Sequence, residues 1–171
     1  MFETFLFILL AVATTITALL VILQRNPVTS AIYLIITIFC LGGIYLLLNA
    51  QFIAIIQVLV YAGAIMVLFL FVIMLLNLEK EQKRRVTRHL WQKALGIFLG
   101  VVLLAQMGMV FYSFLSAGRK GILPPEKVAA MGNTEVVARL LFTDYLLPFE
   151  ITSVLLLVAI IGAIVLAKKQ I

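Results

Sequence analysis

The chain alternates long apolar runs with short polar segments. The apolar runs cover approximately residues 4–23, 28–48, 52–76, 94–115 and 148–167. Each run can cross a hydrocarbon core of about 30 Å, which takes about 20 helical residues. A membrane-spanning backbone must satisfy its own hydrogen bonds, and these runs lack the alternation of barrel strands. The pattern therefore predicts an all-α integral membrane protein with five transmembrane helices, in a single membrane domain over residues 1–171.

The composition supports a membrane protein and limits the chemistry that the chain can perform. Of the 171 residues, 65% are hydrophobic and 12% are charged, whereas an average soluble domain is roughly a quarter charged. This balance excludes an ordinary soluble enzyme. One cysteine and one histidine supply too few ligands for a zinc or haem site, so we expect no metal and no redox cofactor on this chain.

The basic residues indicate how the helices are oriented in the membrane. Nine of them fall at loops and ends that would share one side: Arg25, Lys80, Lys83, Arg84, Arg85, Arg88, Lys93, Lys168 and Lys169. The positive-inside rule makes that side cytoplasmic or matrix-facing, which predicts an outside N-terminus and, in a bacterial inner membrane, a cytoplasmic C-terminus. The same rule explains the basic run at 79–93, so we expect no nucleic-acid partner. The first span is expected to be retained, because residues 1–3 carry no basic group.

A long outer loop, 116–147, connects the last two spans. Its first part contains helix breakers, which are Gly118, Gly121, Pro124 and Pro125. Asn133 is placed to cap a short amphipathic helix. The apolar residues of that helix are Val136, Val137, Leu140 and Leu141. We expect it to lie along the outer membrane face, either as a contact strap on neighbouring subunits or as a plain surface connector.

Small residues that allow helices to approach closely recur along several spans. They are Ala11, Thr14, Thr15 and Ala18 in the first span and Ala159, Ala163 and Ala167 in the last. In the 94–115 span, Gly96 and Gly100 have GxxxG spacing, and Gly108 is expected further along the same face. These faces exceed the needs of a self-contained bundle, so we expect the chain to belong to a large membrane assembly. No internal repeat is visible, which disfavours an autonomous transporter.

The 52–76 span carries polar groups at membrane depth. Gln57, Tyr61, Ala64 and Leu68 follow one another at i, i+4, i+7 and i+11, which places them on one face of an α-helix. Gln57 and Tyr61 are expected to reach one another or a neighbouring helix. Gly63, beside Tyr61, is either a packing site or the position of a local irregularity such as a π-bulge.

Ionisable side chains are almost absent from the predicted spans. The first four spans contain no Asp, Glu, Lys, Arg or His, and the fifth contains Glu150. One interpretation of Glu150 is a normal helix start, with Pro148 at the first helical position and a carboxylate in the first turn. The other is a polar group on a proton path, because such paths use ionisable side chains within the membrane.

Three stretches match a known family. They are Asn26-Pro27-Val28, the block from Val60-Tyr61-Ala62-Gly63-Ala64 through Met74-Leu75-Leu76-Asn77, and Pro148-Phe149-Glu150 with Ser153-Val154-Leu155-Leu156-Leu157. The chain resembles subunit J of the bacterial proton-pumping NADH:quinone oxidoreductases, which is equivalent to mitochondrial chain 6 of respiratory complex I. The resemblance covers all five spans, their order and the long loop before the last.

The resemblance implies a role in coupling rather than in electron transfer. Family members leave the flavin, the iron–sulfur clusters and the quinone to partner subunits. They lie beside subunits of the A, H, K and N types, in bacteria in the inner membrane. The segment around Tyr61 and Gly63, with Gln57 and Ala64, matches a region that switches between α-helix and π-bulge and gates a water path. Many bacterial relatives have glutamate where this chain has Gln57, which cannot exchange a proton. The alternative is a structural or assembly subunit of a related redox complex, without a gate.

Overall fold

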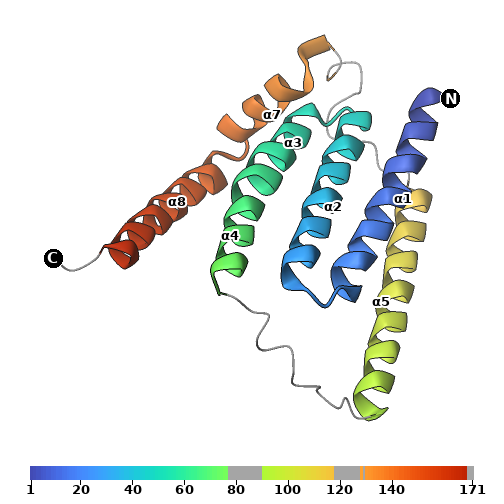
Figure 1. Cartoon of the computed structure of the whole chain (residues 1–171). Helices are drawn as coiled ribbons and strands as arrows, with labels where there is room; N and C mark the ends of the chain where they lie inside the picture. Colours follow the sequence, from blue (N-terminus) through green and yellow to red (C-terminus); the bar gives the residue numbers. More distant parts are fainter. Residues whose placement is uncertain (77–89, 118–127, 129, 169–171) are drawn as a thin grey trace.

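A computed structural model describes residues 1–76, 90–117, 128 and 130–168 of the chain (Figure 1). These residues form helices and no strand. The helices are α1 (Phe2–Leu23), α2 (Pro27–Leu47), α3 (Gln51–Ile56), the π-helix η1 (Gln57–Ile65), α4 (Met66–Leu76), α5 (Leu90–Ala117), α7 (Asn133–Phe142) and α8 (Leu146–Ala167). The all-α architecture predicted from the sequence is confirmed for this part of the chain.

The described helices contain five segments long and apolar enough to cross a membrane. These are Phe2–Leu23, Pro27–Leu47, Gln51–Leu76, Ala94–Leu115 and Leu146–Ala167. Each agrees within a few residues with a run predicted from hydropathy. The third span is composite, because α3, η1 and α4 follow one another without a break.

The first three spans lie side by side, with α2 in the middle (Figure 1). Two adjacent glycines allow α2 to approach both neighbours. A Cβ on Gly43 would lie 3.0 Å from Cδ1 of Leu10 in α1, and a Cβ on Gly42 would lie 3.1 Å from Cγ2 of Val58 in η1. The absence of a side chain at these two positions lets the backbones pack closely, as in other membrane helix pairs.

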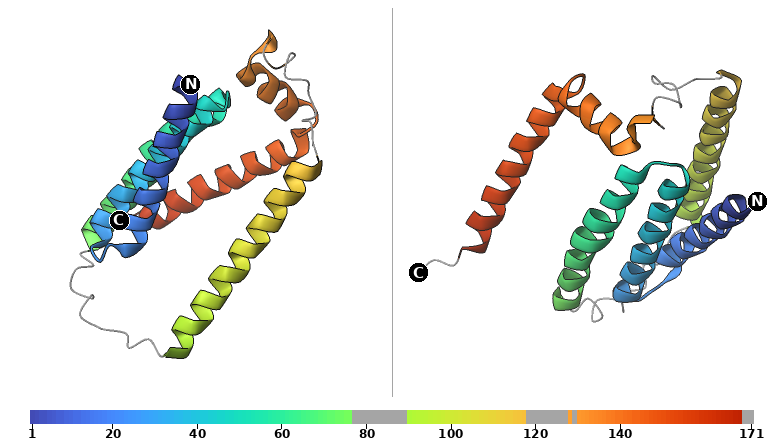
Figure 2. Two further views of the ribbon diagram at one scale, coloured as in Figure 1. Left: turned by 90° about the vertical axis from the view of Figure 1, so that its right-hand side faces the viewer. Right: turned by 90° about the horizontal axis from the view of Figure 1, so that it is seen from above.

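The last two spans stand apart from this layer (Figure 2). α8 has no buried residue, and α5 makes no extensive contact with another described helix. A Cβ added to Gly96, Gly100 or Gly108 would meet no atom of another described segment within 4 Å. Gly108 was also expected on the face of Gly100, but eight α-helical residues advance the direction by about 80° beyond two full turns. The surfaces of α5 and α8 are therefore left for lipid or other subunits.

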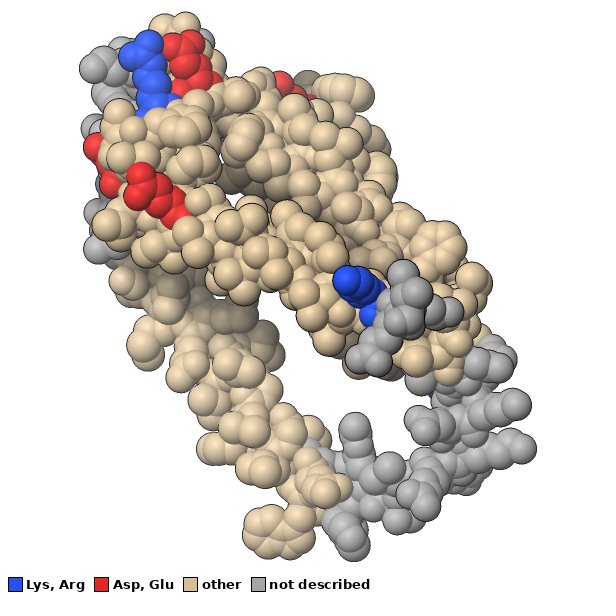
Figure 3. Space-filling model, turned by 90° about the vertical axis from the view of Figure 1, so that its left-hand side faces the viewer, with Lys and Arg blue, Asp and Glu red and all other residues tan. Residues whose placement is uncertain are grey.

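Charged side chains in the described part of the chain lie near the ends of the spans. In Figure 3 the acidic groups gather at the end that carries α7, with basic atoms beside them. The long middle of this face is uncharged. A second group of basic atoms lies away from the α7 end. The α1–α2 turn, the end of α4 and the start of α5 share one end of the structure (Figure 1). Arg25 lies in that α1–α2 turn, and the assignment of this end to the cytoplasmic side stays a prediction.

Candidate functional site

The third span contains a π-helix of nine residues, Gln57–Ile65. At its start, the Gln57 N–H donates to the carbonyls of Ile53 and Ala54. At its end, the Met66 N–H donates to the carbonyl of Tyr61, five residues back. An α-helical bond reaches four residues back, so each π-turn takes in one more residue. π-Helices are rare and short and are frequent at functional sites, which makes η1 the candidate site of this chain.

Gly63 suits the π-turns of η1. A Cβ added to Gly63 would lie 3.3 Å from the carbonyl oxygen of Val58, a separation tighter than most real Cβ contacts. Val58 is five residues before Gly63, and its carbonyl is part of the helix backbone. A side chain at position 63 would therefore push on the π-helical backbone itself. The local irregularity considered for this glycine is present in the structure.

The π-turns keep one face of the third span against α2. Three residues on that face are buried, which are Ala54, Ala62 and Met66, and Val58 between them is half-buried. They are spaced four residues apart. In a continuous α-helix each such step overshoots a full turn by about 40°, so three steps would rotate the last residue by about 120°. The wider turns of η1 remove most of this drift, which explains how Ala54 and Met66 both face α2.

Of the two polar residues of η1, Tyr61 lies on the open side, whereas Gln57 lies near α2, with its Cβ 3.8 Å from a Cβ built on Gly42. Tyr61 is 49% exposed, and Gln57 is half-buried. Neither side chain has a hydrogen-bond partner among the described residues, so the two do not pair with each other. Ala64 and Leu68 are also exposed. The sequence predicted one common face for Gln57, Tyr61, Ala64 and Leu68 from α-helical spacing. That spacing does not apply here, because three of these four residues lie in a π-helix. Polar groups in hydrocarbon need partners, and the described residues supply none for the side chains of Gln57 and Tyr61.

Glu150 lies deeper in its helix than the sequence suggested. α8 begins at Leu146, which makes Pro148 its third residue and Glu150 its fifth. The expected positions of Pro148 at the helix start and of Glu150 in the first turn were therefore wrong. α8 can begin two residues before Pro148 because the first four N–H groups of a helix have no intrahelical partner. A proline, which lacks an N–H, is therefore tolerated among them. The Glu150 carboxylate is exposed and is beyond those free N–H groups.

The amphipathic helix expected in the outer loop is α7. Val136 is buried, and Val137, Leu140 and Leu141 are half-buried. Asn133 does not cap this helix as expected, because Gly132 is the N-cap. Its side chain instead accepts a hydrogen bond from the backbone N–H of Phe52 in α3, at 3.1 Å. The loop residues Gly118, Gly121, Pro124 and Pro125 and the basic residues of 79–89 lie outside the described residues.

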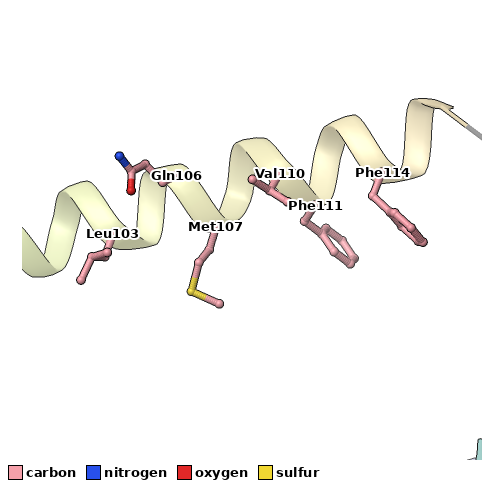
Figure 4. Close-up of a pocket in the computed structure, with 6 residues that line it drawn as sticks. All are labelled: Leu103, Gln106, Met107, Val110, Phe111 and Phe114. Carbon is pink, nitrogen blue, oxygen red and sulfur yellow. The ribbon is translucent and has the colours of Figure 1, made fainter. Parts of the chain in front are cut away.

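The described surface also has a shallow apolar hollow along α5 (Figure 4). It is formed by Leu103, Gln106, Met107, Val110, Phe111 and Phe114. Figure 4 shows Met107, Phe111 and Phe114 projecting on one side of the helix and Gln106 on the other edge. Among the described residues, no three His, Cys, Asp or Glu side chains gather as a metal site requires.

Comparison with known proteins gives matches over almost the whole chain. Residues 17–166 match the family model of NADH-ubiquinone/plastoquinone oxidoreductase chain 6. F(420)H(2) dehydrogenase subunit J of Methanosarcina mazei is 38% identical, over 98% of this chain and 92% of its own. NADH-quinone oxidoreductase subunit J of Rhodobacter capsulatus is 35% identical, over 97% and 82%. NAD(P)H-quinone oxidoreductase chain 6 of Synechocystis is 40% identical, over 96% and 80%.

Proposed function

The chain belongs to the NADH-ubiquinone/plastoquinone oxidoreductase chain 6 family, and from this we propose that it couples quinone reduction to proton translocation through a change in η1 between π- and α-helix. The relatives are subunits of quinone-reducing complexes, so the partners of this chain are other subunits of such a complex. Its five apolar helices and its bacterial subunit J relatives make it a multi-pass protein of the bacterial plasma membrane. The switch in η1 is our proposal.

The observation that carries the proposal is the nine-residue π-helix in the middle of a membrane span. Removing one π-turn would rotate α4 relative to α3 by about 100° and move it along the axis by about 1.5 Å. Gln57 and Tyr61 lie within the segment that changes, where Tyr61 is exposed and Gln57 is half-buried. Their polar groups would move against the neighbouring subunit, which opens or closes a water path beside them. Ala64 lies in the same segment, and its small side chain leaves room for this movement.

Gln57 determines whether this chain supplies a protonatable group at the gate. An amide donates and accepts hydrogen bonds but cannot exchange a proton at working pH. The proton must therefore pass by water and by carboxylates of the adjoining subunit, for which we propose the K type, with the A, H and N types nearby. Glu150 in α8 is the one Asp, Glu, Lys, Arg or His within the predicted spans, and we propose it as the group on this chain that itself takes up a proton.

The cofactors of the complex belong to other subunits in this proposal. An iron–sulfur cluster is held by about four cysteine thiolates, whereas the sequence has one cysteine and one histidine, so these residues do not fit a cluster. We place the flavin, the clusters and the quinone in partner subunits, with no active site on this chain. The electron donor differs among the relatives, whose names refer to F(420)H(2), NADH and NAD(P)H, and we place its binding site in a partner subunit as well.

The charge distribution supports the orientation that we propose. Basic residues lie at every second connection or end: Arg25 follows the first span, the basic run at 79–93 lies between the third and fourth, and Lys168 follows the fifth. Under the positive-inside rule these ends face the cytoplasm. The N-terminus is then outside, the C-terminus is cytoplasmic, and α7 lies on the outer face.

A second candidate function is that of a structural subunit without a gate. It is favoured by α5 and α8, which expose almost all of their apolar surface and are suited to holding other helices. Both functions require the chain to be retained in the complex. They differ in whether a change confined to η1 alters coupling while assembly stays normal.

Gly63→Val tests the gate in membranes that contain the intact complex. Valine at this position pushes on the Val58 carbonyl and favours α-helical geometry, so we expect coupled quinone reductase activity to fall while retention of the chain stays normal. Gly162→Val in α8 is the matched control, because a Cβ there meets nothing within 4 Å. Unchanged activity with unchanged assembly would remove the gate and leave the structural function.

A further inference from the structure

A hydrogen bond joins two segments that are 81 residues apart. The side-chain oxygen of Asn133, the first residue of α7, accepts from the N–H of Phe52, the second residue of α3, at 3.1 Å. The residue that precedes α3, Ala50, makes no side-chain cap of its own. Early N–H groups of a helix lack intrahelical partners. Asn133 therefore caps α3 from a distant part of the chain.

The rest of α7 holds Asn133 in this position. Gly132 has φ +86°, a conformation that glycine adopts without strain, and it allows α7 to begin at Asn133. Val136, one turn further, is 7% exposed, and α7 packs against both α3 and α8. At the other end of α7, the Phe142 ring meets the Phe149 ring of α8 edge to face, with centroids 5.0 Å apart. α7 thus connects the outer ends of the third and fifth spans.

The outer end of the third span is held on a second side by α2. The turn between them is tight: the Ala50 N–H donates to the Tyr45 carbonyl at 2.9 Å, and Asn49 has φ +58°. Close packing of Gly42 against Val58 continues this contact into η1. α3 is therefore fixed by backbone bonds and by a cap. α4 is instead held through packing of its buried residues, Met66 and Ile73.

We infer that Asn133 is a positioning residue for the switch in η1. This inference rests on the proposed function. When a π-turn forms or is lost, one half of the span must turn against the other. With the cap from Asn133 in place, α3 stays fixed and the movement is passed to α4. Without the cap, part of the movement is lost in α3, and coupling weakens although the chain still assembles.

The test uses the intact purified complex with three variants of Asn133. Asn133→Ala removes the acceptor, Asn133→Asp keeps it, and Asn133→Gln moves it by one methylene group. Thr134→Ala, at the exposed neighbouring position, is the matched control. Hydrogen–deuterium exchange of the peptide that contains Phe52 reports the cap directly. Protons translocated per electron pair, measured in vesicles, report the coupling.

We expect Asn133→Ala to speed exchange at the start of α3 about fivefold, as for loss of a helix cap, and to lower the proton ratio by at least about twofold. Asn133→Asp should resemble the parent protein, and Asn133→Gln should be intermediate. Unchanged exchange in Asn133→Ala would overturn the cap. Faster exchange with an unchanged proton ratio would overturn the positioning role.

Failure of the gate itself has a different signature. If Gly63→Val leaves the proton ratio unchanged, the switch in η1 is wrong, whatever Asn133→Ala does to exchange. If Gly63→Val lowers the ratio and Asn133→Ala does not, the gate stands and the role of Asn133 is wrong. The two proposals are therefore separated by the same pair of measurements.

Discussion

The hydroxyl of Thr37 in α2 donates a hydrogen bond to the hydroxyl of Thr17 in α1, with 2.8 Å between the oxygens. Thr37 is 7% exposed and is the one buried polar side chain among the described residues. Thr17 in turn donates to the carbonyl of Ala13, at 2.8 Å. Both hydroxyls are therefore satisfied inside the helix pair, where lipid could not satisfy them. The pair fixes the register of α1 against α2.

Removing this contact should weaken the α1–α2 pair modestly. We expect a double-mutant cycle of Thr17→Val and Thr37→Val to give a coupling energy of about 0.6 kcal/mol, the average for such bonds in membranes. The readout is retention of the chain in the purified complex over a temperature series. Thr15→Val is the control, because the Thr15 hydroxyl donates to the carbonyl of Ala11 in its own helix and, among the described residues, to no other helix. A cycle with no coupling would mean that the Thr17–Thr37 bond contributes nothing.

A larger effect is expected at Gly42, because its neighbour Val58 belongs to η1. Gly42→Leu would force α2 and η1 apart, and overpacking of this kind costs about 1–3 kcal/mol. We expect both retention of the chain and quinone reductase activity to fall, as measured on membranes by immunoblot and assay. For Gly162→Leu, whose added side chain would enter open space beside α8, we expect retention and activity to fall less. Equal behaviour of the two variants would contradict close α2–η1 packing in the assembled protein.

The spans were predictable because membrane insertion depends on the length and hydropathy of a single segment. All five runs agree with described helices to within a few residues. The start of α2 was also predictable from the sequence. The Asn26 side chain accepts from the N–H groups of Val28 and Thr29, and Pro27 is the first helical residue. Asparagine followed by proline is a local signal for this geometry, and local signals need no knowledge of the fold.

The predictions that were wrong or missing concern features that depend on how segments pack against one another. Helical spacing assumed α-turns around Tyr61, and the π-helix changes the direction of every residue through it. Asn133 was assigned to its own helix, because a sequence does not show that the start of α3 lies beside it. Gly42 and Gly43 were not singled out, although a pair of glycines in the middle of an apolar span was a usable signal. Which helix each glycine faces became visible only with the three spans packed together.

The cap of α2 offers a clean test of stability at the α1–α2 turn. Asn26→Ala removes the acceptor for Val28 and Thr29, which lie at 2.9 and 3.3 Å from it. Loss of such a cap costs about 1 kcal/mol. We expect a lower midpoint for thermal release of the chain from the complex, with activity at moderate temperature kept. Asn26→Asp preserves the acceptor and should match the parent; a similar loss in both variants would show that the cap is not the cause.

Glu150 allows the two interpretations of its carboxylate to be separated. As the fifth residue of α8 it is beyond the N–H groups that a first-turn carboxylate would stabilise, so its charge is not needed to begin the helix. We therefore expect Glu150→Gln to leave retention in the complex unchanged and to lower protons translocated per electron pair in vesicles. An ionisable group within a span is costly unless it serves a path or a partner.

The control for Glu150→Gln is Glu135→Gln in α7. Glu135 pairs with Arg139 at 2.8 Å, but both side chains are more than half exposed, and exposed pairs of this kind contribute little. Removing this charge should change neither retention nor the proton ratio. A normal proton ratio in Glu150→Gln would exclude Glu150 from the proton path. Loss of the chain from the complex would instead mean that the carboxylate is bound by a partner subunit, because nothing in the described part of α8 depends on its charge.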